Sequence, residues 1–300
     1  IWAEMLEDRK FYLTPDSPES PWHVVGGDGI LTMETEDAYA GDHNPRVALV
    51  QGAERGLVQR GLGLVAGRDY VGRVVLRGPV GGGATVSLIW GPGTQQKQTF
   101  PIRPFDQAFK TYQFRFTAGE DTDDGALQIL ARGLGPMDIG AVSLMPADNI
   151  HGMRRDTLAL LKELDSPVYR WPGGNFVSGY DWRDGIGDPD RRPPRKNPAW
   201  KGIEHNDFGI DEFMIFCREI DTEPYVVVNT GLGELDMALA KLEYTNGAAD
   251  TPMGRLRAEN GHTGPYNVHW WGIGNEMYGD WQLGHMPLEE YVVKNNAFAG

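Results

Sequence analysis

The sequence contains one cysteine, Cys217, and no long apolar run. A single thiol excludes an internal disulfide framework and a cysteine-rich metal site. Its place in the apolar helical stretch Phe213–Cys217 predicts a buried core residue. No apolar run is long enough to span a membrane, so no membrane partner is expected. No signal peptide is recognisable and the first residue is Ile1, so we expect a processed, trimmed or excerpted start. The compartment stays open between secreted or periplasmic and cytoplasmic.

Positive charge is also scarce. Lysine and arginine number 28 against 42 aspartates and glutamates, which gives a formal net charge of -14. A surface this acidic repels nucleic acid and anionic lipid, so neither is an expected partner. Neutral substrates such as sugars are compatible with it, although the charge could serve solubility alone.

Several common catalytic patterns are missing. His205, His262, His269 and His285 show no metal-ligand spacing, and no serine nucleophile elbow is present. Gly231-Leu232-Gly233 is too weak a match for a phosphate-binding turn, because it lacks a third glycine at the right place. We therefore expect no metal and no cofactor.

The first half of the chain has the pattern of an all-β domain. Short β-rich runs alternate with Gly, Asp and Pro turns from about residue 15 to residue 144, which predicts a β-sandwich or jelly roll. Trp22, Trp90 and Tyr112 could form a sugar-stacking platform there or belong to the core. The expected strands are Ile30–Glu36, Arg46–Gln51, Tyr70–Arg77, Thr85–Trp90, Thr111–Thr117 and Ala126–Ala131.

After Asn149 helices alternate with apolar strands, which predicts a parallel sheet covered by helices. Each strand ends in a loop rich in glycine, asparagine and aromatic residues, as in a β/α barrel that gathers its chemistry at strand ends. The expected helices are Arg154–Leu164, Asp211–Glu219, Met237–Tyr244 and Leu288–Ala297, and the expected strands are Val168–Arg170, Pro224–Asn229 and His269–Gly274.

Glu276 is the strongest catalytic candidate. It follows the apolar run His269–Gly274, so it should lie at the C-terminal tip of a buried strand. A carboxyl there, walled by Trp and Tyr, should be desolvated and so retain its proton, as a general acid at neutral pH requires. Asn275 beside it can bind a sugar hydroxyl. The alternative is a structural carboxylate paired with a neighbouring arginine.

Five further residues follow strands or lie in the loops between elements. Asn175, after Gly173-Gly174, could bind sugar hydroxyls or hold a tight turn. Asn229, at a third polar strand end, is expected to bind substrate. Trp200, on a loop rich in Pro and Arg, could stack on a sugar or anchor its loop. Trp281 and Gln282 follow Glu276 closely and could line the same rim.

Together these stretches resemble glycoside hydrolase family 51, the α-L-arabinofuranosidase family. The matching segments are Arg170–Asp188 (RWPGGNFVSGYDWRDGIGD), Asn206–Phe216 (NDFGIDEFMIF), Tyr225–Gly231 (YVVVNTG) and Trp271–Glu290 (WGIGNEMYGDWQLGHMPLEE). Residues 1–12 also look like the family's segment after its first barrel strand. The resemblance covers residues 1–12 and about 150–300.

The resemblance implies an α/β fold: a (β/α)8 TIM barrel, only partly covered by this chain, with an inserted carbohydrate-binding-like β-sandwich. Residues 1–12 would end the first barrel unit, residues 13–148 would be the insert, and residues 149–300 the first half of the catalytic barrel. Glu276 would be the acid/base, with the nucleophilic glutamate beyond residue 300. Asn175 and Asn275 would bind the arabinose, and Trp200 matches a tryptophan of the family's equivalent loop.

The implied function is that of a retaining hydrolase, which removes terminal α-L-arabinofuranosyl residues from arabinose-containing polysaccharides or oligosaccharides. The expected partners are those glycans and, as is common in the family, further copies of the chain in a homo-oligomer. Two alternatives remain: an endo-β-1,4-glucanase or β-xylosidase on the same scaffold, because fold does not determine the sugar, or a non-catalytic carbohydrate-binding protein.

Overall fold

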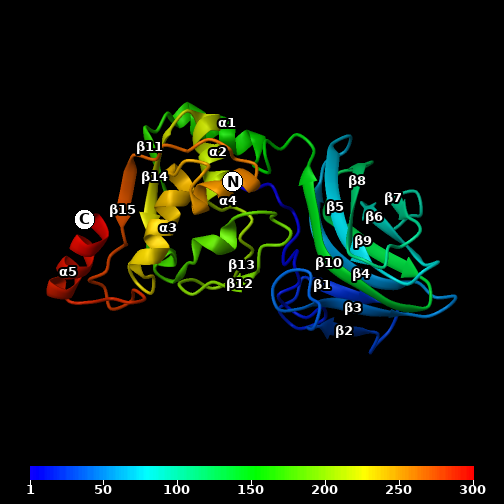
Figure 1. Ribbon diagram of the computed structural model, residues 1–300. Coiled ribbons are helices and arrows are strands. Elements are labelled where there is room, and N and C mark those ends of the chain that lie inside the picture. Colours follow the sequence, from blue (N-terminus) through cyan, green and yellow to red (C-terminus); the bar gives the residue numbers. More distant parts are fainter. The chain divides into compact units, whose positions relative to one another are not determined.

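The computed structural model describes residues 1–300 and divides them into two compact units, Ile1–Arg155 and Asp156–Gly300. The first unit is built from strands, whereas the second alternates strands and helices (Figure 1). None of the helices combines the length and apolar character needed to cross a membrane.

The first unit is a β-sandwich, as the sequence predicted. One antiparallel sheet has the strand order β1-β4-β9-β6-β7, and the other has the order β2-β3-β10-β5-β8. The strands are β1 (Trp22–Val25), β2 (Leu31–Glu34), β3 (Asn44–Leu49), β4 (Arg55–Leu64), β5 (Asp69–Arg77), β6 (Gly83–Ile89), β7 (Lys97–Ile102), β8 (Lys110–Thr117), β9 (Thr122–Arg132) and β10 (Gly135–Pro146).

Alternate side chains of both sheets fill the sandwich core. Leu88 and Ile129 come from one sheet and Val74 and Leu144 from the other, and all are fully buried. The predicted sugar-stacking role is wrong for Trp22, which is fully buried. Its indole N–H donates to the Asp8 carbonyl at 3.2 Å. Trp90 and Tyr112 are half-buried and pack against the same core. These aromatics therefore stabilise the sandwich.

The N-terminal residues contribute to this unit. Leu6 and Phe11 lie in the sandwich core. The first residues run beside residues 152–154: the amide of Ala3 donates to Gly152 at 2.8 Å, and the amide of Arg154 donates to Ile1 at 2.8 Å. The chain thus enters and leaves the sandwich at one place.

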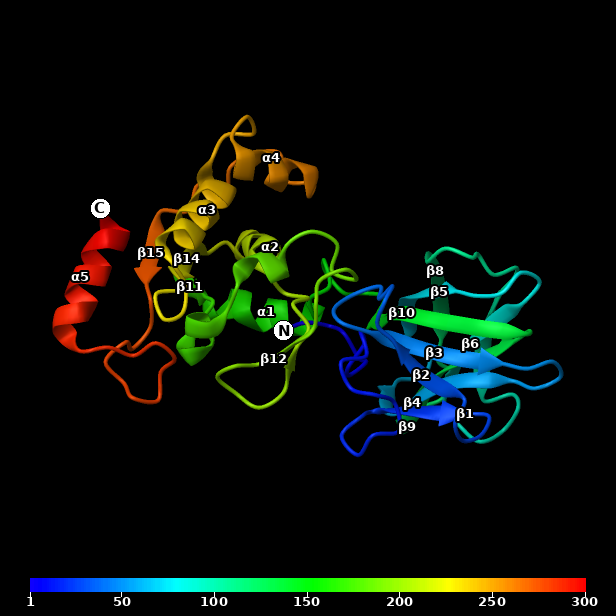
Figure 2. The ribbon, with the colours of Figure 1, turned by 60° about the horizontal axis from the view of Figure 1, so that its bottom comes forward.

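The second unit contains a parallel sheet of order β11-β14-β15. Figure 2 shows these strands side by side, with α5 beyond β15. All expected strands and helices are present within a few residues of their predicted ends. The elements are α1 (Arg155–Leu164), β11 (Val168–Trp171), the 3-10 helices η1 (Gly174–Gly179) and η2 (Trp182–Gly185), the short strands β12 (Arg195–Lys196) and β13 (Ile203–Glu204), α2 (Ile210–Ile220), β14 (Glu223–Val228), α3 (Leu235–Asn246), α4 (Pro252–Glu259), β15 (Trp270–Ile273) and α5 (Leu288–Ala299).

Helix α2 shows why this pattern folds as it does. Its apolar side chains, including Phe213 and Phe216, are buried and face β11 and β14. The helix ends at Asp221, whose left-handed conformation stops it. Cys217 is buried on the same helix, which confirms the predicted core thiol, and burial raises the pKa of that thiol to about 12.

Candidate active site

The three parallel strands bring their following loops to one edge of the sheet. Trp171 of β11 pairs with Val226 of β14, and Val228 pairs with Ile273 of β15. Past the strands, the amide of Gly274 still donates to the Val228 carbonyl at 3.1 Å. The polar segments 172–175, 229–231 and 274–276 therefore share the carboxyl edge, where barrel enzymes place their catalytic groups.

Gly274 allows two of these loops to approach closely. Its φ is +74°, and an ideal Cβ there would lie 2.0 Å from the Thr230 hydroxyl oxygen. Any larger residue would push Thr230 away, so glycine is required by both conformation and space.

Glu276 lies at the end of β15, as predicted, with φ at 48° in the left-handed region. Its carboxylate makes no ion pair or hydrogen bond within the chain, which argues against the structural reading of a carboxylate paired with arginine. The prediction that this carboxyl is buried is wrong within residues 1–300, because Glu276 is exposed. Tyr278 and Trp281 are 74% and 58% exposed, with their ring centroids 5.9 Å apart in an edge-on contact. They contact each other instead of walling the carboxyl.

Asn275 has a buried hydrogen-bond donor without a partner in the chain. The residue is 9% exposed, and its amide nitrogen, Nδ2, has no hydrogen-bond partner. Two neighbours on these loops share the feature: Thr230 Oγ1 and Gln282 Oε1 are also buried and unpaired. Buried polar atoms are nearly always hydrogen-bonded in proteins, so three such atoms in these loops indicate a place for a polar ligand.

Asn229 makes hydrogen bonds with the backbone of its own loop and of a neighbouring segment. Its Oδ1 accepts hydrogen bonds from the amides of Gly231 and Gly233 at 3.0 and 3.1 Å, and its Nδ2 donates to the Tyr180 carbonyl at 3.3 Å. With both ends of the amide occupied by backbone groups, Asn229 holds the loop after β14 in shape. Binding of a sugar hydroxyl by Asn229 stays a prediction.

Asn175 and Trp200 come together, although 24 residues separate them in the sequence. Asn175 is half-buried in η1, and its amide makes no hydrogen bond within the chain. Trp200 is 54% exposed and stacks on the next residue, Phe176, with ring centroids 6.1 Å apart and planes 16° from parallel. The Asn197 side chain accepts from the Trp200 amide at 2.8 Å and so fixes the loop that presents the indole.

Two buried polar residues not singled out as functional from sequence support these loops. Ser178 receives a short hydrogen bond from Gln282, lies 3.8 Å from the Met277 sulfur and accepts the Leu232 amide through its carbonyl. Lys241 lies beneath the edge: its Nζ donates to Val227 at 3.0 Å. Burial lowers the pKa of Lys241 to about 7. A helical lysine gives no sequence signal of such burial.

The second unit is similar in sequence to known proteins. Residues 160–299 match the family model described as the alpha-L-arabinofuranosidase 1 domain. A probable alpha-L-arabinofuranosidase C of Aspergillus fumigatus is 50% identical over 149 residues, covering 50% of this chain and 30% of the relative. An intracellular exo-alpha-(1->5)-L-arabinofuranosidase of Bifidobacterium longum is 47% identical over 147 residues, covering 49% of this chain and 26% of the relative. The second unit is thus similar in sequence to one segment of these arabinofuranosidases.

Solved structures agree and extend the likeness to both units. The GH51 alpha-L-arabinofuranosidase of Thermotoga petrophila is 52% identical, with a TM-score of 0.50 over 51% of this chain and 32% of that one. The arabinose-bound MgGH51 α-L-arabinofuranosidase has a similar fold at 18% identity. That match has a TM-score of 0.79 and covers 92% of this chain and 51% of the other. These matches confirm, over the second half of the chain, the resemblance to glycoside hydrolase family 51. The chain spans less than a third of the curated relatives it matches.

Proposed function

We propose that the chain is part of a retaining α-L-arabinofuranosidase in which Glu276 is the acid/base catalyst. The observation that carries this proposal is the pair Asn275–Glu276 at the end of β15: a carboxylate without a partner beside a buried amide donor without a partner. A proton donor next to a hydroxyl ligand is what cleavage of a glycosidic bond requires. The similarity of residues 160–299 to arabinofuranosidases supports the furanoside as substrate.

The chemistry would proceed in two steps. Glu276 gives its proton to the glycosidic oxygen while a second glutamate, expected beyond residue 300, attacks the anomeric carbon and the leaving group departs as an alcohol. Glu276 then takes a proton from water, whose oxygen attacks the anomeric carbon and releases the second glutamate. In retaining enzymes the two carboxyls stand about 5–5.5 Å apart.

The sugar would bind along the carboxyl edge of the sheet. Asn275 Nδ2 and the free amide of Asn175 would bind hydroxyls, and Trp200 would offer its exposed indole face to an apolar sugar face. Thr230 and Gln282 add two unpaired oxygens to the same loops. Asn229 would act through the loop that it holds.

The proposed fold is a (β/α)8 barrel of which residues 149–300 are the first half. The order β11-β14-β15 with intervening helices is that of consecutive β/α units. Trp270 on β15 and Val293 on α5 are 60% and 71% exposed, as expected of a face that further barrel units would cover. Residues 13–148 would be an insert, which the adjacency of residues 1–3 and 152–154 supports. Residues 1–12 would end the first barrel unit and lead into the insert, since Leu6 and Phe11 already pack in the sandwich core. Assembly into a homo-oligomer stays a prediction.

The test is hydrolysis of an aryl α-L-arabinofuranoside by the full-length protein and by Glu276→Gln. We expect turnover that falls by about a hundredfold or more in the variant, the order that general acid/base catalysis contributes. Glu234→Gln is a matched control, because Glu234 is an exposed glutamate after β14 that has no proposed role in the chemistry, and it should keep full activity.

Two outcomes would overturn parts of the proposal. Turnover of an aryl β-xyloside or of cellulose oligosaccharides instead would retain the mechanism and replace the substrate. Sugar binding without any turnover by the full-length protein would favour the carbohydrate-binding alternative.

A further inference from the structure

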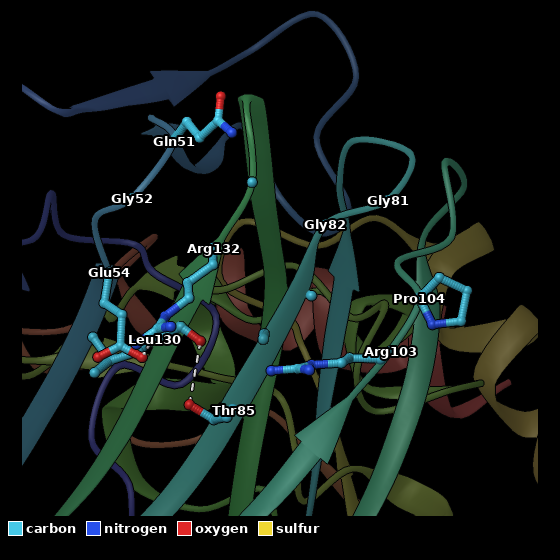
Figure 3. A pocket seen from close by; sticks show the side chains of 13 residues that line it. Gln51, Gly52, Glu54, Gly81, Gly82, Thr85, Arg103, Pro104, Leu130 and Arg132 are labelled. Carbon is cyan, nitrogen blue, oxygen red and sulfur yellow. Dashed lines mark hydrogen bonds and ion pairs between the residues drawn. The ribbon is translucent and has the colours of Figure 1, made fainter.

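The sandwich unit has a groove of its own, about 700 Å³ in volume. It lies over β6 and β9 and is bordered by the glycine-rich segments 51–54 and 81–83 and by residues 103–104 (Figure 3). All lining residues belong to the sandwich. The volume is in the range of sites for small molecules and short oligomers.

Arg103 is a charged residue of this groove that has no partner within the chain. Its guanidinium makes no hydrogen bond or ion pair within the chain, and the residue is exposed. Its stem lies over Gly83, where an ideal Cβ would meet the Arg103 Cγ at 2.7 Å. Glycine at this position therefore gives Arg103 its path along the groove. The other arginine, Arg132, is already paired with Glu54 at 3.0 Å.

The backbone leaves the rest of the groove open. Ideal Cβ atoms on Gly52 and Gly81 would meet nothing within 4 Å, and both residues have φ near +80° (+84° and +79°). Larger residues there would be strained and would narrow the space. Glycines at such positions let a ligand approach the main chain closely.

The lining chemistry narrows the ligand class. It contains no aromatic side chain, so stacking on a neutral sugar is not available. An unpaired guanidinium is a fork that binds a carboxylate through two parallel hydrogen bonds. Thr85 and Gln51 line the same groove and suit hydroxyl groups, and the Glu54 carboxylate, which is paired with Arg132, disfavours a ligand with several negative charges.

We propose that this groove binds a carboxylate-bearing glycan, such as a uronic acid unit of a polysaccharide, with Arg103 holding the carboxylate. The site goes beyond the proposed hydrolysis, because it neither uses Glu276 nor requires turnover. It would attach the protein to acidic regions of a polysaccharide although the chain itself has a formal net charge of -14.

The test is calorimetric titration of the full-length protein with two probes: a xylo-oligosaccharide carrying one glucuronic acid branch and the same oligosaccharide without it. We expect the acidic probe to bind and the neutral one to bind at least about tenfold more weakly, the range of a charge-assisted hydrogen-bonded pair. Arg103→Ala should weaken the acidic probe by at least about tenfold, and Arg103→Lys should restore only part of that loss, because lysine lacks the fork.

The matched control is Arg60→Ala, which removes an exposed arginine from β4 of the same sheet outside the groove. It should bind the acidic probe like the wild type, and all variants should show the wild-type melting temperature. Equal binding of both probes, or unchanged binding by Arg103→Ala, would overturn the proposal. Inorganic phosphate binding as tightly as the acidic probe would refute the glycan and leave a simple anion site. Loss of arabinofuranoside hydrolysis would leave these titrations unaffected, so the two proposals fail separately.

Discussion

Lys241 allows a quantitative test of the structure beneath the candidate active site. The residue is 3% exposed, and burial lowers the pKa of its ammonium group from 10.5 to about 7. Its contacts are the Val227 carbonyl, at 3.0 Å, and the Trp171 ring, whose centroid lies 4.9 Å from Nζ. No carboxylate pairs with it.

The sign follows from proton binding in the two states. Below about pH 7 the amine is protonated both folded and unfolded, so the folded state bears the whole cost of the buried charge. Between pH 7 and 10.5 only the unfolded state binds the proton, so the free energy of unfolding rises with pH. At 1.36 kcal/mol per pKa unit the full difference is about 5 kcal/mol, of which about 3 kcal/mol falls between pH 6 and pH 9.5.

The perturbation is Lys241→Met, which retains an unbranched side chain of similar length and removes the titration. Denaturant unfolding of the full-length wild type and variant at pH 6 and pH 9.5 gives the difference in unfolding free energy at each pH. Groups common to both proteins cancel. We expect the wild type to gain about 3 kcal/mol relative to the variant between the two pH values. Lys201→Met, at an exposed lysine, should show no such change. A Lys241→Met difference that stays constant with pH would refute the reasoning.

Two further predictions concern buried polar groups. Thr230→Val removes a hydroxyl that is fully buried and unpaired, so the free energy of unfolding should stay within roughly 1 kcal/mol of the wild type. The rate of arabinofuranoside hydrolysis should fall. A loss of several kcal/mol in thermal unfolding would show that the hydroxyl already has a partner. Arg192→Met breaks a buried two-fold pair with Glu212, at 2.8 and 2.9 Å, and should cost about 3–5 kcal/mol. Arg195→Met, which breaks a pair with Asp184 in which the arginine is 51% exposed, should cost less in the same denaturation assay, because exposed pairs contribute about 1 kcal/mol or less.

The sandwich shows which strands a sequence pattern reveals. The predicted strands follow alternating apolar residues, whereas β1, β4, β7 and β10 were missed. In β10 the residues Gly135, Pro136 and Asp138 have the composition of a turn. Asp138 is nevertheless buried and paired with Arg46 at 2.7 Å and with Arg77 at 2.6 Å. Those arginines lie 92 and 61 residues away, so no local window contains the compensation.

Glycine residues also hide strands from a prediction based on apolar alternation. Gly140 marks a register shift in the pairing of β10 with β5, and an ideal Cβ there would meet Tyr39 at 2.5 Å. In β4 and β7, glycines and Pro101 interrupt the apolar alternation. By contrast, the three strands of the parallel sheet and four of the helices of the second unit were predicted, because the strands are continuous apolar runs and these helices have apolar residues at helical spacing; α4, the 3-10 helices and the short strands β12 and β13 were missed.

Some features of the candidate site could also be predicted from local sequence, and others could not. The position of Glu276 after a buried strand could be predicted, because strand and loop are adjacent in the chain. Its exposure could not, since walling of the carboxyl depends on where Tyr278 and Trp281 turn. The loop-holding contacts of Asn229 did have a local signal: the amides of the glycines two and four residues later donate to its side-chain oxygen, as in an Asx turn.

Hydrogen-bond satisfaction then separates residues that shape the site from residues that face a ligand. Asn229 and Asn275 are equally buried, at 9% exposure each, and both follow parallel strands. Asn229 has backbone partners for both ends of its amide, so a sugar would have to break existing bonds to use it. Asn275 has an unpaired donor, so a sugar hydroxyl would supply a bond that the protein lacks. Two asparagines alike in sequence context and burial therefore differ in what they can offer, and Asn275 with Glu276 is where substrate should meet the chain.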